Sequence, residues 1–182
     1  MNTYKKTIMT LSIAFVIVPQ ISKALDTDGV AITGALKTMY VNNFMPNKIL
    51  TNTDLTQWHT IINGSFSNYI TKNSTLAGIS DKLLRESLNQ TKEICTALKT
   101  AIETARQNYT SGDFYGMQSA ITALTKIKNG IVSIEATLKK ESYYIPSKKN
   151  AQEVLLTALE FMRGAAETAI AKLKQEAKVT EI

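Results

Sequence analysis

Between residues 84 and 138, mostly apolar side chains recur at steps of three and four residues. Two rows have this spacing: Leu84, Leu88, Thr91, Cys95, Leu98, Ile102, Ala105 and Tyr109, and then Met117, Ala120, Leu124, Ile127, Ile131, Ile134 and Leu138. Such steps keep a row of side chains on one face of an α-helix. The spacing therefore predicts two long helices, at about 80–110 and 113–141, that pack through their apolar faces as in a coiled coil.

Residues that end and begin helices separate these two rows. Ser80 suits the N-cap of the first helix and Gly112 suits its C-terminal stop, while Asp113 suits the N-cap of the second. The connection of residues 110–113 is too short for anything but an antiparallel hairpin. On its outer face the second helix is expected to carry polar residues, namely Lys126, Lys128, Glu135, Lys139 and Lys140.

A third long helix is predicted at about 148–178, beginning near Ser147 or Asn150. Its apolar residues cover more than one stripe: Val154, Leu155, Ala158, Leu159, Phe161, Met162, Ala165, Ala166, Ala169, Ile170 and Leu173. A helix that is apolar over so wide an arc is wedged between neighbours, so we place it at the centre of the fold.

Two shorter helices are expected before these three, at about 28–42 and 54–70. The second is capped by Asp54 and weakened by Gly64, and it presents Leu55, Trp58, Ile62, Phe66 and Tyr69. No segment shows sustained strand alternation. The predicted fold is therefore all-α: an antiparallel helical bundle of three long and two shorter helices in a single domain, 25–182, after a cleaved signal peptide.

Residues 1–24 have the features of an export signal. Lys5 and Lys6 form a positive head, an apolar run follows over residues 8–18, and residues 22–24 read small-x-small, which predicts cleavage after Ala24. The apolar run is about half the roughly twenty residues that a membrane-spanning helix needs. We therefore expect a mature protein without a stable membrane anchor, in the periplasm or outside the cell.

Charge gives little support to nucleic-acid binding. The whole chain has 21 Lys and Arg against 15 Asp and Glu, but three of those lysines lie in residues 1–24, which leaves a net charge of +3 after cleavage. Basic residues are interspersed with Glu along the predicted helices and form no dense stripe of the kind that a phosphate backbone requires. We expect a protein partner and no nucleic acid.

The sequence offers poor material for catalysis or for metal binding. His59 is its only histidine and Cys95 its only cysteine, which cannot supply a normal zinc site, and no serine has a nucleophile-elbow pattern. Cys95 lies on an apolar stripe and is expected to be a buried, inert thiol. We therefore expect no enzyme, no cofactor and no metal. One alternative is a non-covalent haem or apolar-ligand carrier, with His59 and one of four methionines as axial ligands: Met39, Met45, Met117 or Met162.

One connecting segment has the composition of a contact surface. Aromatic and basic side chains follow each other in this loop, at Tyr143, Tyr144, Ile145, Lys148 and Lys149. Two interpretations stay open: a partner contact, or a lid that closes one end of the bundle. The leading hypothesis is an exported helical bundle that acts through its surface as a binding, adaptor or protective protein, and the other alternative is a secreted effector or toxin-like protein.

Overall fold

The computed structural model describes residues 25–44, 48–50 and 55–180, and most of these residues are helical. The all-α prediction is confirmed. Residues 1–24, on which the predicted signal peptide falls, lie outside the described part, as do Met45 and Asp54. The elements are, in order, α1 (Thr27–Asn43), α2 (Leu55–Ile61), a π-helical segment η1 (Ile62–Phe66), α3 (Ser67–Ser74), β1 (Thr75–Leu76), β2 (Ile79–Ser80), α4 (Lys82–Ser111), α5 (Phe114–Lys139) and α6 (Pro146–Thr180).

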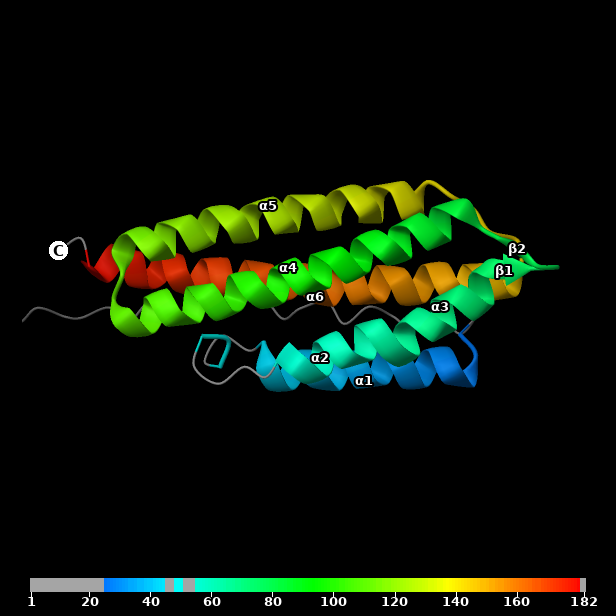
Figure 1. Ribbon diagram of the computed structural model, residues 1–182, viewed down its shortest axis with the longest axis horizontal. Coiled ribbons are helices and arrows are strands. Elements are labelled where there is room, and N and C mark those ends of the chain that lie inside the picture. Colours follow the sequence, from blue (N-terminus) through cyan, green and yellow to red (C-terminus); the bar gives the residue numbers. More distant parts are fainter. Residues whose placement is uncertain (1–24, 45–47, 51–54, 181–182) are drawn as a thin grey trace, which may run out of the picture.

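The three long helices lie side by side along the long axis of the molecule (Figure 1). Helix α6 contacts α4 and α5 on one side and α1 and α3 on the other, so it lies at the centre of the fold. The chain connects α4 to α5 at one end, whereas the β1–β2 hairpin and the α5–α6 loop lie together at the opposite end. This second end is where the candidate contact loop is found.

The apolar rows that predict α4 and α5 form much of the core. Every member from Leu84 to Ala105 is buried, and so is every member from Met117 to Leu138 except the partly buried Ile127. Gly112 ends α4 in the left-handed conformation, and the Asp113 side chain caps α5, as predicted. The predicted cap at Ser80 is wrong: this residue ends β2, and the Asp81 carboxylate caps α4 instead by accepting from the Leu84 N–H.

Glu135 does not lie on the polar outer face of α5 where the sequence predicts it. Its side chain is only 9% exposed, and Oε1 accepts a hydrogen bond of 3.2 Å from Nε of Arg163 on α6. A buried carboxylate is costly unless it is paired, so this ion pair fixes how α5 and α6 face each other.

Helix α6 begins at Pro146, earlier than either predicted start. Proline suits the first turn of a helix because the N–H that it lacks would have no helical partner there. Asn150 is therefore a buried residue inside the helix and not its cap. Further along, Gly164 lets α1 approach closely, because a Cβ at this position would lie 2.6 Å from the Tyr40 hydroxyl.

The second predicted helix exists but is irregular and longer than expected. Its predicted apolar face is buried. Gly64 has φ −101° and ψ −107°, which lie outside the helical region, and the hydrogen bonding widens to the π type around it. Over the described residues, no helix combines the length and the apolarity that crossing a bilayer requires.

Candidate functional site

A single carboxylate joins the candidate contact loop to the start of α4. Asp81 Oδ1 accepts a hydrogen bond of 3.0 Å from the Tyr143 hydroxyl, and Asp81 Oδ2 lies 3.0 Å from the Lys148 ammonium. The Asp81 backbone N–H in turn donates to the Ser74 carbonyl, which closes the β1–β2 hairpin. Two of the five predicted site residues therefore hold the end of the bundle together.

Burial and hydrogen bonding shift the pKa of the Asp81 carboxyl group in opposite directions. Burial alone would raise the pKa of Asp81, but the bonds from the Leu84 N–H, Lys148 and Tyr143 outweigh it, and the pKa falls below its ordinary value. For Tyr143 both effects raise the pKa: the phenol is partly buried, and it donates to a negative acceptor. At neutral pH the cluster is therefore an ionised carboxylate held by a phenol and an ammonium.

The other predicted residues at this end are more open. Tyr144 is 94% exposed, Lys149 is exposed and Ile145 is half-buried. The nearby hairpin adds two large apolar side chains, Leu76 and Ile79, which are paired across the strands and are 49% and 76% exposed. We call residues 72–85 and 139–149 together the hairpin end.

The sequence did not predict the hairpin because each strand has only two residues. Its turn is formed by Ala77 (φ 52°) and Gly78 (φ 79°), both left-handed, which is the two-residue turn that matches the twist of paired strands. Alanine is an unusual residue in that conformation. Gly78 followed by Ile79 was a local signal of a turn before a strand, but a weak one.

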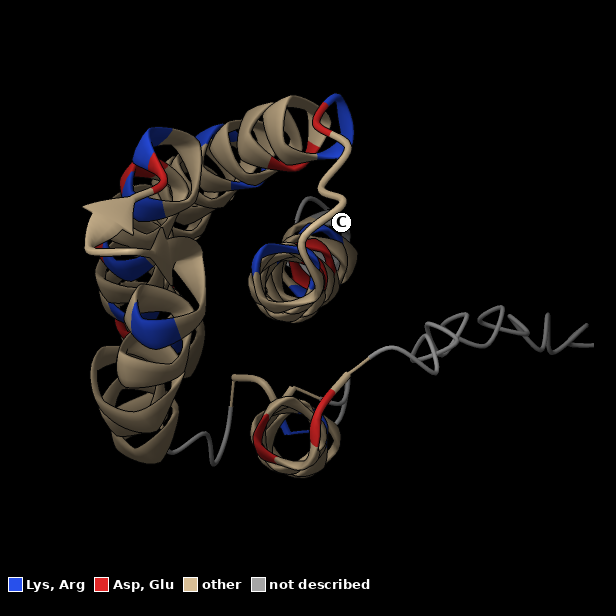
Figure 2. Ribbon diagram, turned by 90° about the vertical axis from the view of Figure 1, so that its right-hand side faces the viewer, with Lys and Arg blue, Asp and Glu red and all other residues tan. Residues whose placement is uncertain are grey.

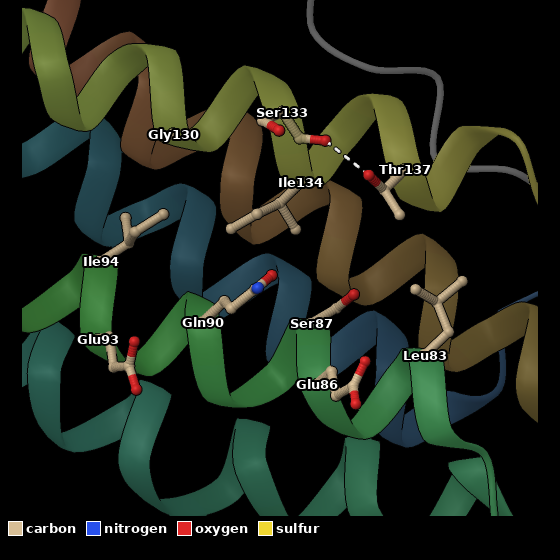
Figure 3. Close-up of a pocket in the computed structure, with 10 residues that line it drawn as sticks. All are labelled: Leu83, Glu86, Ser87, Gln90, Glu93, Ile94, Gly130, Ser133, Ile134 and Thr137. Atoms are coloured by element: carbon tan, nitrogen blue, oxygen red, sulfur yellow. Dashed lines mark hydrogen bonds between the residues drawn. The ribbon is translucent and has the colours of Figure 1, made fainter.

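A shallow groove of about 400 Å³ lies between α4 and α5 (Figure 3). Its lining comes from both helices: Leu83, Glu86, Ser87, Gln90, Glu93 and Ile94 on α4, and Gly130, Ser133, Ile134 and Thr137 on α5. Gly130 keeps the groove open, because a Cβ there would meet only the tip of Ile94, at 3.8 Å. The spacing analysis missed this site, since it followed only the apolar face that each helix turns inward.

The groove is mixed in character and acidic on the α4 side. Leu83, Ile94 and Ile134 supply apolar surface, and the Thr137 hydroxyl is occupied by a hydrogen bond of 3.0 Å to the Ser133 carbonyl. Glu86 and Glu93 stand two turns apart on α4. Glu86 lies 3.8 Å from Lys82, but both side chains are exposed, so this ion pair is weak. Glu86 can therefore pair with a basic residue of a partner instead.

The residues proposed for haem are not brought into one open site. His59 is on the surface of α2, where its Nε2 lies 3.2 Å from the Thr96 hydroxyl of α4. Met39, Met117 and Met162 are buried members of the core, and Met45 lies outside the described residues. Within the described part of the chain, no three His, Cys, Asp or Glu side chains cluster as metal ligands would.

Cys95 is buried, as predicted. Burial raises the pKa of its thiol to about 12, and the Trp58 indole and the Lys99 ammonium only partly oppose this effect. A thiol with so high a pKa carries almost no reactive thiolate at neutral pH. Comparison of the chain with protein-family models, with curated proteins and with solved structures finds no match.

Proposed function

We propose that the protein is exported to the periplasm or beyond, loses residues 1–24, and acts as a binding protein whose α4–α5 groove holds a helical segment of a protein partner. Export is supported by Lys5, Lys6 and the short apolar run before Ala24. N-terminal sequencing of the exported protein should begin at Leu25, and material that begins at Met1 would contradict cleavage.

The observation that carries the binding proposal is the spacing of the groove-lining residues. On each helix they follow each other at steps of three and four, which is the spacing of the side of a helix that faces another helix. A further helix laid between α4 and α5 would place its own i, i+3, i+4 and i+7 side chains against Leu83, Ile94 and Ile134. Gly130 leaves room at one end of that contact, opposite Ile94.

Charge narrows the class of partner. Glu86 and Glu93 are both exposed on the α4 side and are seven residues apart, which is about 10 Å along a helix. A partner helix with Lys or Arg two turns apart would meet both carboxylates. We therefore propose an amphipathic segment with one apolar face and a basic edge.

Two matched glycine substitutions test this proposal. Gly130→Leu adds bulk to the groove lining, and its Cβ would make only an ordinary contact with Ile94, at 3.8 Å. Gly34→Leu is the control, because it makes the same change on α1, where nothing lies within 4 Å of the added Cβ. Both variants should fold at least as well as the wild type, since leucine favours a helix more than glycine does.

The measurement is photo-crosslinking in the native compartment from an unnatural residue at Gln90, which is exposed in the groove. We expect one protein adduct, mapped by mass spectrometry to a basic amphipathic helix. Gly130→Leu should abolish that adduct and Gly34→Leu should keep it. An adduct that survives Gly130→Leu, or one mapped to an acidic or extended segment, would overturn the proposal.

A further inference from the structure

We propose that the hairpin end docks on an anionic lipid bilayer, with Leu76, Ile79 and Tyr144 entering the interface and the surrounding lysines contacting lipid phosphates. This contact lies at the end of the bundle, whereas the proposed partner groove lies on its flank (Figures 1 and 3). The proposed apolar anchors are independent of the groove, because none of Leu76, Ile79 and Tyr144 lines it.

Three large apolar side chains are exposed at this end of the molecule. Leu76 and Ile79 are neighbours across the hairpin, and Tyr144 comes from the α5–α6 loop, which the bonds of Tyr143 and Lys148 to Asp81 hold beside it. A tyrosine suits the headgroup level of a membrane because its ring is apolar and its hydroxyl is polar. Leu76 and Ile79 lie directly on either side of the two-residue turn of Ala77 and Gly78.

The hairpin end also concentrates positive charge. Its two segments contain seven basic residues, Lys72, Lys82, Arg85, Lys139, Lys140, Lys148 and Lys149, against only Asp81 and Glu141. The net charge of residues 25–182 is only +3, so the remainder of that span is net acidic. Figure 2 looks onto this end and shows Lys and Arg spread over the helix ends, with Asp and Glu among them and the hairpin at one edge. Four acidic residues also lie toward this end and reduce its excess to about +1: Asp26, Asp28, Glu86 and Glu153.

The shape of this end favours a bilayer over a protein partner. The hairpin extends beyond the ends of the neighbouring helices (Figure 1), so its apolar side chains form a projection. A protein would need a matching pocket to bury them, whereas the interface of a bilayer accepts them without one. Lysines that surround a projection can reach a flat anionic surface at the same time.

Vesicle co-sedimentation tests the proposal, with the protein purified from the compartment in which it accumulates. We expect binding to phosphatidylcholine vesicles that contain about 30% phosphatidylglycerol and much weaker binding to phosphatidylcholine alone. Raising the salt to about 0.5 M should release the protein, since screening shortens the reach of the lysines. Absence of binding to the anionic vesicles would overturn the proposal.

Substitution of exposed apolar residues tests whether the hairpin end, and not another part of the surface, binds the vesicles. The double variant Ile79→Ser/Tyr144→Ser should lower the vesicle partition constant by about tenfold or more, because both side chains leave the interface. Tyr115→Ser is the matched control: Tyr115 is 83% exposed but follows the α4–α5 turn at the opposite end, so its loss should change nothing. Equal binding by the double variant and the control would overturn the proposal.

Charge-reversal variants test the proposed contact between lysines and lipid phosphates. Lys82→Glu/Lys149→Glu should weaken binding to anionic vesicles by about tenfold or more and leave the weak binding to neutral vesicles unchanged. Lys174→Glu, an exposed residue near the far end of α6, is the control. Two results together would show that the hairpin end docks a protein and that the membrane proposal is wrong. These are unchanged lipid binding in every variant, and loss of a protein that co-purifies in equal amount with the wild type but not with Ile79→Ser/Tyr144→Ser. Crosslinks from Gln90 should stay unchanged in Ile79→Ser/Tyr144→Ser, because neither residue lines the groove.

Discussion

Replacing Asp81 with alanine removes three hydrogen bonds at once from the hairpin end. The carboxylate accepts from the Leu84 N–H at 3.1 Å, from the Tyr143 hydroxyl at 3.0 Å and from the Lys148 ammonium at 3.0 Å. Losing an N-cap costs about 0.5–2 kcal/mol. The Lys148 and Asp81 side chains are 19% and 16% exposed, so leaving partly buried donors without an acceptor adds about 1–3 kcal/mol.

We therefore expect Asp81→Ala to lower the free energy of unfolding by about 2–4 kcal/mol and the Tm by roughly 5–15 °C. The control is Asp113→Ala. Asp113 caps α5 with the same geometry, accepting from Gly116 at 3.0 Å, but its carboxylate is exposed, so the loss should be about 0.5–1 kcal/mol. Urea unfolding followed by circular dichroism measures both. Equal losses in the two variants would refute the stabilising role of Tyr143 and Lys148.

The same carboxylate predicts a dependence on pH. Because folding lowers the pKa of Asp81 below its ordinary value of 3.8, its ionisation stabilises the fold fully above that value, and this stabilisation is lost as the pH falls through the folded pKa. Asp81→Asn keeps an N-cap but carries no charge. The stability difference between wild type and Asp81→Asn should therefore be present at neutral pH and shrink in acid. A difference that stays constant down to about pH 2 would contradict the ion pair with Lys148.

Three further predictions concern side-chain packing. Leu124→Ala should cost about 2–5 kcal/mol in urea unfolding, since the side chain is fully buried between packed helices; a change below about 0.5 kcal/mol would place it in solvent. Gly164→Ala should destabilise the fold by about 1–2 kcal/mol, because its Cβ would meet the Tyr40 hydroxyl. Gly130→Ala should stabilise the fold by about 0.5–1 kcal/mol, because alanine favours a helix more than glycine does. Equal changes of Tm in the two variants would contradict the close approach of α1 to Gly164. Cys95 in the native protein should react with a disulfide reagent near pH 8 only as fast as the protein opens, and labelling at the rate of a free thiol would show that it is accessible.

Helical spacing predicts most of the core of this protein because burial follows the period of the helix. The rows from Leu84 and from Met117 lie inside, and the broad apolar arc of α6 corresponds to a helix with neighbours on several sides. Gly112 and Asp113 were predictable for a local reason, since the conformation of a cap depends on few residues. The departure at Gly64 could be anticipated as a weakness, although not as a π-helical segment.

The remaining differences depend on contacts between segments that are distant in sequence. Asp81 and Ser80 are both good caps, and Asp81 also receives Tyr143 and Lys148, which lie more than sixty residues away. Glu135 was predicted to be exposed because spacing alone does not reveal that Arg163 of α6 lies opposite. The groove was not predicted because it consists of residues that the core leaves out, and such residues follow no apolar period. At the hairpin end, the composition indicated the loop with Tyr144 but not the hairpin beside it.

The central place of α6 has a consequence for how the chain is made. Among the described helices it is the last to leave the ribosome, and α1, α3, α4 and α5 all rest on it. Until residues 146–180 emerge, α4 and α5 can pack on each other, but the surfaces that α1, α3, α4 and α5 bury against α6 stay exposed, so the nascent chain has no complete core. A chain that ends before Pro146 would therefore leave those apolar surfaces in water, and we expect it to be prone to aggregation and proteolysis.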